Sequence, residues 1–287
     1  MFTLKENDKS YRPEDFGTTA LPGHIHPSPE QIDRTLYIPG ADGLFHFGSN
    51  FGVRTFELPM LVIPQQNKIE LQKRIRAFTS IFYTSTGKPK ELELSFDYEP
   101  EKYYIVRISN RIVPNRLLTL SEFTLVLTAN DPYAYADQNY IPEYVDNSLQ
   151  YDSGYNYEPP QNHLIYGEPK SYFYENGTEF NWLYSRQYSS IYNFADMQVP
   201  LAIEVEGSVN YPRLTNLTTG VQMQLPSISN QVMVIDANRF TVKVDGVSKL
   251  TLHKGDFLHL APTLNQLLFE GGSPNAAVRY KWNHKFI

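Results

Sequence analysis

The sequence predicts a mainly β protein of two domains: an α+β domain at residues 1–136 and an antiparallel β-sandwich at residues 137–287. Three observations favour this fold class. Apolar and polar residues alternate with period two in many short runs, as in half-buried strands. One segment alone has the spacing of an amphipathic helix. The 20 prolines and 16 glycines among 287 residues suit short strands joined by turns.

Four alternating runs in the N-terminal domain are expected to be strands. The first is 53–58, where Arg54, Phe56 and Leu58 share one face. The apolar positions of the other three are Leu92, Leu94 and Phe96; Tyr104, Val106 and Ile108; and Phe123, Leu125 and Leu127. These runs indicate a sheet with one buried face.

A single amphipathic helix is expected over residues 69–82. Asn67 is suited to cap its N-terminus, and Glu70 follows three residues later. The apolar residues at helical spacing are Leu71, Ile75, Phe78 and Phe82. Gly87 and Pro89 then prevent the helix from continuing. One such helix among strands predicts that it lies on a sheet.

The C-terminal domain shows strand patterns without a helix. Ile203 and Val205 alternate with polar neighbours, and further alternating runs continue to Trp282. Asp245-Gly246 between two valines is a two-residue hairpin signal. Short strands at this spacing predict a sandwich or barrel.

Residues 137–196 differ from the rest of the chain. They hold two basic and nine acidic residues, and eleven of the 21 tyrosines. Because disordered segments are poor in aromatics, we expect an ordered, tyrosine-lined stretch. Its rings are interpreted either as a surface that meets a partner or as a cover for the neighbouring sandwich. The candidate partner residues are Tyr155, Tyr157, Tyr172, Tyr174 and Trp182.

Composition excludes several classes of function. The 31 acidic and 25 basic residues give a net charge of −6, which argues against a general binder of nucleic acid. The absence of cysteine removes disulfides, thiol chemistry and cysteine-ligated zinc. No apolar run is long enough to span a bilayer, and the charged N-terminus does not resemble a secretory leader. We therefore expect no membrane partner.

Motifs for catalysis and cofactor binding are also missing. The sequence contains no nucleophile elbow, P-loop, dinucleotide fingerprint or zinc-protease motif, so we expect neither an enzyme nor a cofactor. His24 and His26 form the arrangement closest to a metal half-site, which Asp33 or His46 could complete. The prolines around this pair favour instead an exposed loop without a metal.

The order of motifs along the chain resembles the distal tail protein (Dit) family of siphophages that infect Gram-positive bacteria. In the N-terminal part the matching segments are 37–43 (YIPGADG), the Arg-containing strand at 53–58, the helix at 69–82, the strand at 92–96, 103–106 (YYIV) and 123–135 (FTLVLTANDPYAY). In the C-terminal part they are 212–220 (PRLTNLTTG), 234–236 (VID) and 255–257 (GDF) before Asn265.

This resemblance implies a structural role without catalysis or cofactor. Members of the family form a homo-hexameric ring at the tail tip of the virion, between the tail tube protein and the tail-associated hub protein. The N-terminal belt domain forms the ring, and DNA passes through its channel without specific binding. The C-terminal domain is galectin-like and offers attachment to receptor-binding proteins. The resemblance implies that such a protein is made in the host cytoplasm. The alternative function is a carbohydrate-binding module that recognises cell-wall glycans through Trp182 or nearby tyrosines.

Overall fold

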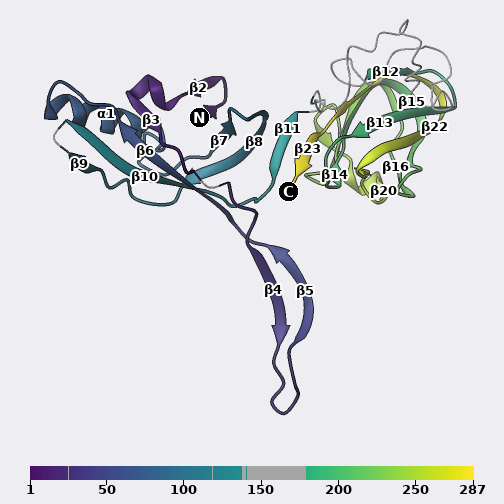
Figure 1. Cartoon of the computed structure of the whole chain (residues 1–287). Coiled ribbons are helices and arrows are strands. Elements are labelled where there is room, and N and C mark those ends of the chain that lie inside the picture. Colours follow the sequence, from purple (N-terminus) through teal and green to yellow (C-terminus); the bar gives the residue numbers. More distant parts are fainter. Residues whose placement is uncertain (25, 118, 138–139, 141–178) are drawn as a thin grey trace, which may run out of the picture. The chain divides into compact units, whose positions relative to one another are not determined.

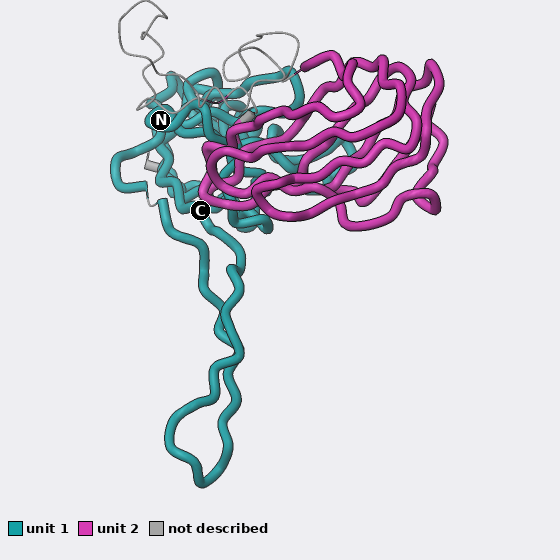
Figure 2. Tube along the Cα trace, turned by 90° about the vertical axis from the view of Figure 1, so that its right-hand side faces the viewer, with its two compact units in different colours: residues 1–135, 287 teal, residues 136–286 magenta. Residues whose placement is uncertain are grey.

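The structure is a computed structural model that describes the chain except residues 25, 118, 138–139 and 141–178 (Figure 1). It divides into two compact units (Figure 2). Unit 1 comprises Met1–Tyr135 with Ile287, and unit 2 comprises Ala136–Phe286. The predicted mainly β fold class is confirmed: both units are built from antiparallel sheets, and the described residues contain one α-helix.

Unit 1 contains a twisted antiparallel sheet with strand order β2-β1-β7-β8-β10-β6-β3. The four strands predicted in this half are present as β6, β7, β8 and β10, with their apolar positions buried. The bounds of the elements are β1 Phe2–Glu6, β2 Lys9–Tyr11, η1 Pro13–Phe16, β3 Thr18–Ala20, β6 Arg54–Val62, β7 Leu92–Phe96, β8 Glu99–Ile108, β9 Asn115–Leu117, β10 Leu120–Ala129 and β11 Ala134–Asp137.

The predicted helix is confirmed as α1, Lys68–Ser80. The Asn67 side chain accepts hydrogen bonds from the backbone N–H groups of Ile69 and Glu70 at 3.0 and 2.9 Å. Phe78 is buried and its ring contacts that of Phe123 on β10, so the helix lies on the sheet as expected. The helix ends earlier than predicted, at a turn where two hydroxyl side chains bond backbone carbonyls of the preceding turn.

A separate two-stranded sheet leaves the body of unit 1. It consists of β4, Gln31–Leu36, and β5, Phe45–Phe51, joined by the segment 37–44. Figure 1 shows this hairpin running away from the main sheet. Its sequence lacks the regular alternation that predicts a strand pair. The arm is hereafter residues 30–53.

Unit 2 is a nine-stranded antiparallel sheet curled around one hydrophobic core, with the path β12-β22-β15-β17-β18-β19. Its long strands β15 and β22 pair along most of their lengths, and the register shifts between Ser208 and Arg213. The bounds are β12 Glu179–Trp182, β13 Arg186–Asn193, β14 Val199–Pro200, β15 Ala202–Asn216, β16 Val221–Gln224, β17 Ile228–Asp236, β18 Thr241–Val244, β19 Val247–Ser248, η3 Leu250–Leu252, β20 Lys254–Gly255, β21 His259–Leu260, β22 Thr263–Lys281 and β23 Asn283–Phe286.

One turn and one glycine within a strand explain how these strands approach one another. Asp245 and Gly246 have φ of 48° and 78°, which is the hairpin turn that their sequence predicts. Gly207 lies where β15 passes β22, with φ 138°, and a Cβ there would stand 2.3 Å from the carbonyl oxygen of Asn275. Only glycine permits this approach.

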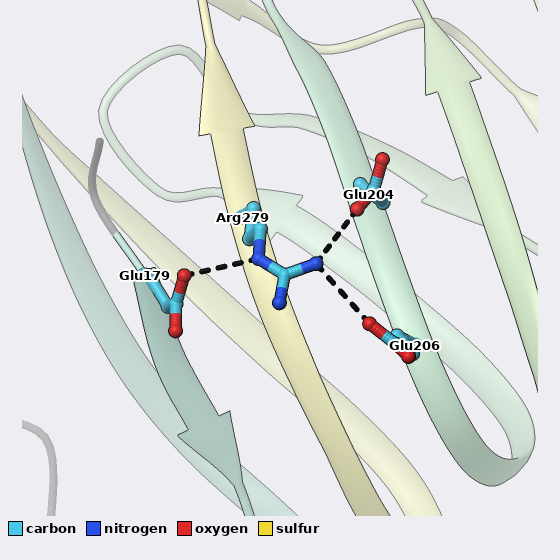
Figure 3. A network of polar contacts seen from close by, with 4 residues as sticks. All are labelled: Glu179, Glu204, Glu206 and Arg279. Carbon is cyan, nitrogen blue, oxygen red and sulfur yellow. Dashed lines mark hydrogen bonds and ion pairs between the residues drawn. The ribbon is translucent and has the colours of Figure 1, made fainter.

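A charge network joins three strands on the surface of unit 2. Arg279 of β22 bonds Glu179 of β12 at 3.0 Å, and Glu204 and Glu206 of β15 at 2.9 and 3.1 Å (Figure 3). These hydrogen bonds and charges raise the pKa of Arg279 above its ordinary value. The network ties the edge strand β12 to the sheet.

Candidate assembly surface

The arm has two chemically different faces. Ile32, Arg34 and Leu36 share a face because side chains alternate along a strand. Leu36 pairs with Phe45 on β5, so Phe45 and Phe47 lie on that same face. The side chains of Ile32, Leu36, Phe45 and Phe47 are 49%, 49%, 52% and 66% exposed. The arm therefore presents a strip of large apolar side chains to its surroundings.

The opposite face is polar except for Phe51, which pairs with Gln31, and its polar groups are hydrogen-bonded to one another. The Ser49 hydroxyl donates to Asp33 Oδ1 at 2.5 Å, and Gln31 Nε2 donates to both residues. His46 Nε2 lies 3.1 Å from Ser49 Oγ and 3.7 Å from Asp33 Oδ1. The bond from Ser49, with a smaller effect of Gln31, lowers the pKa of Asp33. A bulge at Gly48, φ 102°, brings this cluster together.

This serine, histidine and aspartate do not form a catalytic triad. In a triad the imidazole stands between serine and carboxylate, using a different nitrogen for each. Here the same nitrogen of His46, Nε2, faces both Ser49 Oγ and Asp33 Oδ1. The Ser49 hydroxyl donates its proton in a hydrogen bond to Asp33. All three side chains lie on an exposed hairpin. The cluster stabilises the arm and has no arrangement for nucleophilic attack.

The root of the arm is fixed by a buried arginine. Arg54, 5% exposed, follows the strand that leaves the arm, and its guanidinium donates to the carbonyl of Pro27, which lies on the segment that enters the arm, at 2.7 Å. It also donates to the carbonyl of Pro132 at 3.3 Å. The Gly52 N–H donates to the Glu30 carbonyl at 2.7 Å. Both chain segments of the arm are thus joined at one point.

An aromatic cluster covers this root. The His26 ring nitrogens Nδ1 and Nε2 each lie 2.8 Å from a tyrosine hydroxyl, those of Tyr98 and Tyr104 respectively. Burial, and then the charge of Arg54, lower the pKa of His26. Burial raises the pKa of Tyr98 to about 12 and also raises that of Tyr104. We call His26, Arg54, Tyr98 and Tyr104 the clasp.

The structure changes the interpretation of the two histidines. The proline-rich segment was expected to be an exposed loop, but His24 stacks on Phe96 and Tyr98 at 5.7 Å, and both nitrogens of His26 face tyrosine hydroxyls. Among the described residues no group of three or more His, Asp or Glu could hold a metal ion. Proline content alone could not reveal aromatic partners located some 70 residues away in the chain.

The tyrosine-rich stretch contributes little to the described surface. Tyr155, Tyr157, Tyr172 and Tyr174 lie outside the described residues. Trp182, expected to face a partner, is 0% exposed: its ring packs on Phe269 and its indole N–H donates to the Tyr184 carbonyl. The alternation of Phe180 with Trp182, both buried on β12, was the signal for this core position.

Family models match both units of this fold. Residues 15–129 match the family model described as phage tail protein RIFT-related domain, and residues 195–286 match the one described as siphovirus-type tail component, C-terminal domain. The chain belongs to the distal tail (Dit) protein family of siphophages. It is thus a structural component of a siphophage tail.

Solved structures share the fold. The crystal structure of SPP1 Dit (gp 19.1), described as a paradigm of the hub adsorption apparatus in phages infecting Gram-positive bacteria, matches with a TM-score of 0.67 at 12% identity over 100% of both chains. A structure of the phage P2 baseplate, activated with Ca, has a TM-score of 0.47 at 8% identity over 100% of this chain and 99% of that chain. No curated protein sequence matches the chain. No helix among the described residues is long and apolar enough to cross a membrane.

Proposed function

We propose that this chain forms a homo-hexameric ring at the tail tip, joining the tail tube protein to the tail-associated hub protein. Unit 1 forms the ring, and unit 2 offers attachment to receptor-binding proteins. Six-fold symmetry and these neighbours are inferred from the family to which the chain belongs. The observation that carries ring formation is the arm.

The arm needs a partner because it does not bury its apolar strip. In the described part of the chain, β4 and β5 pair with each other and with no other strand. Isolated two-stranded hairpins are marginally stable in water. The apolar strip is exposed, whereas the polar groups on the opposite face are hydrogen-bonded within the arm. This combination is typical of a segment that lies on another molecule.

A second copy of the chain is the partner that symmetry favours. In a ring each subunit donates one surface and receives another, so every arm in a closed ring is covered. Fully burying a large apolar side chain stabilises by about 1.5–3 kcal/mol. Four half-exposed side chains would then contribute on the order of 4 kcal/mol per interface. That offsets only the lower end of the cost of association, so the bodies of neighbouring subunits must contact each other as well.

The charge balance supports a channel that lets DNA pass without holding it. Affinity for a phosphate backbone comes from clustered Lys and Arg that release counterions. Residues 1–136, which are proposed to form the ring, hold 15 basic and 16 acidic residues, so the ring has no excess of positive charge.

The ring is tested by placing a charge on the apolar strip. Purified full-length protein is examined by native mass spectrometry and negative-stain microscopy at increasing concentration, alone and with the tail tube and hub proteins. We expect six-fold annular particles. Phe47→Asp should abolish them, since a buried unpaired carboxylate costs several kcal/mol.

Thr35→Asp is the matched control, because Thr35 lies on the polar face of the same hairpin, paired with His46. It should assemble like the unmodified chain. Rings that form equally well with Phe47→Asp would show that the arm is not the contact. A chain that stays monomeric at every concentration, with both partner proteins present, would contradict the proposal itself.

A further inference from the structure

Three segments of unit 2 meet in a surface that carries no charged residue. They are 207–212 of β15, 226–231 at the start of β17, and 271–276 of β22. None of them contains Asp, Glu, Lys or Arg, whereas these types make up 20% of the chain. The segments lie side by side, because Gly207 pairs with both Gln231 and Ala276. The backbone N–H of Asn230 also donates to Ser208 Oγ at 2.8 Å. We call these three segments the neutral surface.

Tyr211 stands out from the neutral surface on a strained backbone. Its φ is 50°, a left-handed conformation that is an outlier for a bulky residue, and its N–H donates to Ser227 Oγ at 2.8 Å. The side chain is 87% exposed, more than any other large hydrophobic side chain in the described ranges. Its ring packs on no other aromatic ring among those residues. The fold does not use this ring, and backbone strain of this kind is typical of binding sites.

Three side-chain amides accompany the ring. Asn210 precedes Tyr211 in the chain, Asn275 pairs with Ser208, and the N–H of Asn230 bonds the Ser208 hydroxyl. All three asparagines are exposed, and their side-chain amides form no hydrogen bond within the described part of the chain. An amide carries both a donor and an acceptor, so it can bond two neighbouring hydroxyl groups of a ligand. The neutral surface therefore offers one aromatic face and several uncharged hydrogen-bonding groups.

The surroundings favour an uncharged and polar ligand. Charged side chains at the border of the surface already bond partners within the chain: Glu206 bonds Arg279 at 3.1 Å (Figure 3), Arg213 pairs with Glu270 at 3.8 Å, and Asp245 accepts from Gln231 at 2.8 Å. A charged ligand would have to compete with these pairs. The aliphatic side chains of Val209 and Ile228 are buried, so the surface lacks the apolar centre that a protein interface needs.

The neutral surface rests on a rigid floor. A Cβ on Gly271 would stand 2.5 Å from Cγ2 of Val209 and 3.0 Å from Cζ2 of Trp182, so the backbone there lies directly on buried side chains. Trp182, a candidate for stacking on a sugar in the sequence analysis, thus supports the surface from inside. A site held in place in this way does not lose conformational freedom when a ligand binds.

We propose that the neutral surface binds a neutral saccharide. One face of a sugar ring, which presents C–H groups, stacks on Tyr211, and the sugar hydroxyl groups bond the amides of Asn210, Asn230 and Asn275. The site lies wholly in unit 2, so this inference goes beyond the proposed ring and does not rest on it. A free sugar and a polysaccharide present the same chemistry to the site.

Binding is tested by saturation-transfer difference nuclear magnetic resonance on the purified full-length chain. The probes are glucose, galactose and N-acetylglucosamine at millimolar concentration, each as the single sugar and as a linear trisaccharide, with glucuronic acid as the charged comparison. We expect transfer to at least one neutral probe and none to glucuronic acid. A trisaccharide that binds more tightly than its single sugar identifies a polysaccharide as the ligand, and equal binding identifies a free sugar.

Substitutions of Tyr211 separate loss of the ligand from loss of the fold. Tyr211→Ala should weaken binding about tenfold or more, whereas Tyr211→Phe, which keeps the ring, should bind like the unmodified chain. Tyr211→Gly should unfold at the same or higher denaturant concentration, because glycine adopts this φ without strain, and yet should not bind. Tyr184→Ala is the matched control, since Tyr184 is 47% exposed in the same unit at an ordinary φ.

The outcomes distinguish this inference from the proposed function. Failure of every neutral probe to bind the unmodified chain would overturn it. Binding that persists in Tyr211→Ala, or that Tyr184→Ala weakens equally, would overturn it as well. Absence of rings would contradict only the proposed function, because saccharide binding is measured on the chain whatever its state of assembly.

Discussion

The buried guanidinium of Arg54 satisfies two backbone carbonyls, those of Pro27 and Pro132. Arg54→Ala would leave both without a donor, so we expect the free energy of unfolding of unit 1 to fall by about 2–4 kcal/mol. Urea denaturation followed by far-ultraviolet circular dichroism measures this loss. Both tryptophans, Trp182 and Trp282, lie in unit 2. Their fluorescence therefore reports the unfolding of unit 2, which Arg54→Ala should leave unchanged. The exposed Arg107→Ala should change stability by less than about 0.5 kcal/mol. Equal effects of the two substitutions would contradict this role.

At the scale of elements, α1 offers a prediction with a built-in control. Asn67 accepts two N–H groups of the first turn, and Asn67→Ala leaves them without that acceptor. We expect a loss of about 1 kcal/mol in the free energy of unfolding of unit 1. Asn67→Asp keeps the acceptor and adds a charge that favours the helix N-terminus, so it should retain full stability. Chemical denaturation followed at 222 nm compares the variants. An aspartate variant as unstable as the alanine variant would show that the cap does not act through its side-chain oxygen.

Elements with one buried face could be predicted from the sequence, and the arm could not. Helix α1 and strands β6, β7, β8 and β10 carry apolar residues at a constant period because each packs on one core. In the arm, Gly48 inserts an extra residue into β5, which breaks the alternation between Phe47 and Ser49. In the clasp, His26 contacts Tyr98 and Tyr104, which lie 72 and 78 positions later in the chain. Local periodicity in the sequence cannot predict such long-range pairs. The local pattern in the arm is weak, because Arg34 stands between Ile32 and Leu36 on their face and only Phe45 and Phe47 alternate.

At the scale of the whole molecule, the two units differ in where they place their exposed apolar side chains. Unit 2 has one apolar core, although single side chains such as Tyr211, Phe240 and Leu252 are exposed, and the charges of Arg279 hold its edge strand to the sheet. Unit 1 has a similar sheet but leaves the strip on its arm uncovered. The proposed ring therefore derives its specificity from unit 1, while unit 2 is free to vary in what it carries without disturbing ring closure.

An assembly closed by an apolar arm should respond to salt in a characteristic way. Raising NaCl to about 1 M shortens the Debye length to about 3 Å and weakens contacts between exposed charges. Burial of the apolar strip is unaffected, and screening of the net charge of −6 reduces repulsion between copies. We therefore expect the fraction of protein in rings, measured by analytical ultracentrifugation of the full chain, to stay constant or rise with salt. Phe47→Asp should remain unassembled at every salt concentration. Rings that dissociate as salt is added would show that ion pairs, and not the arm, close the interface.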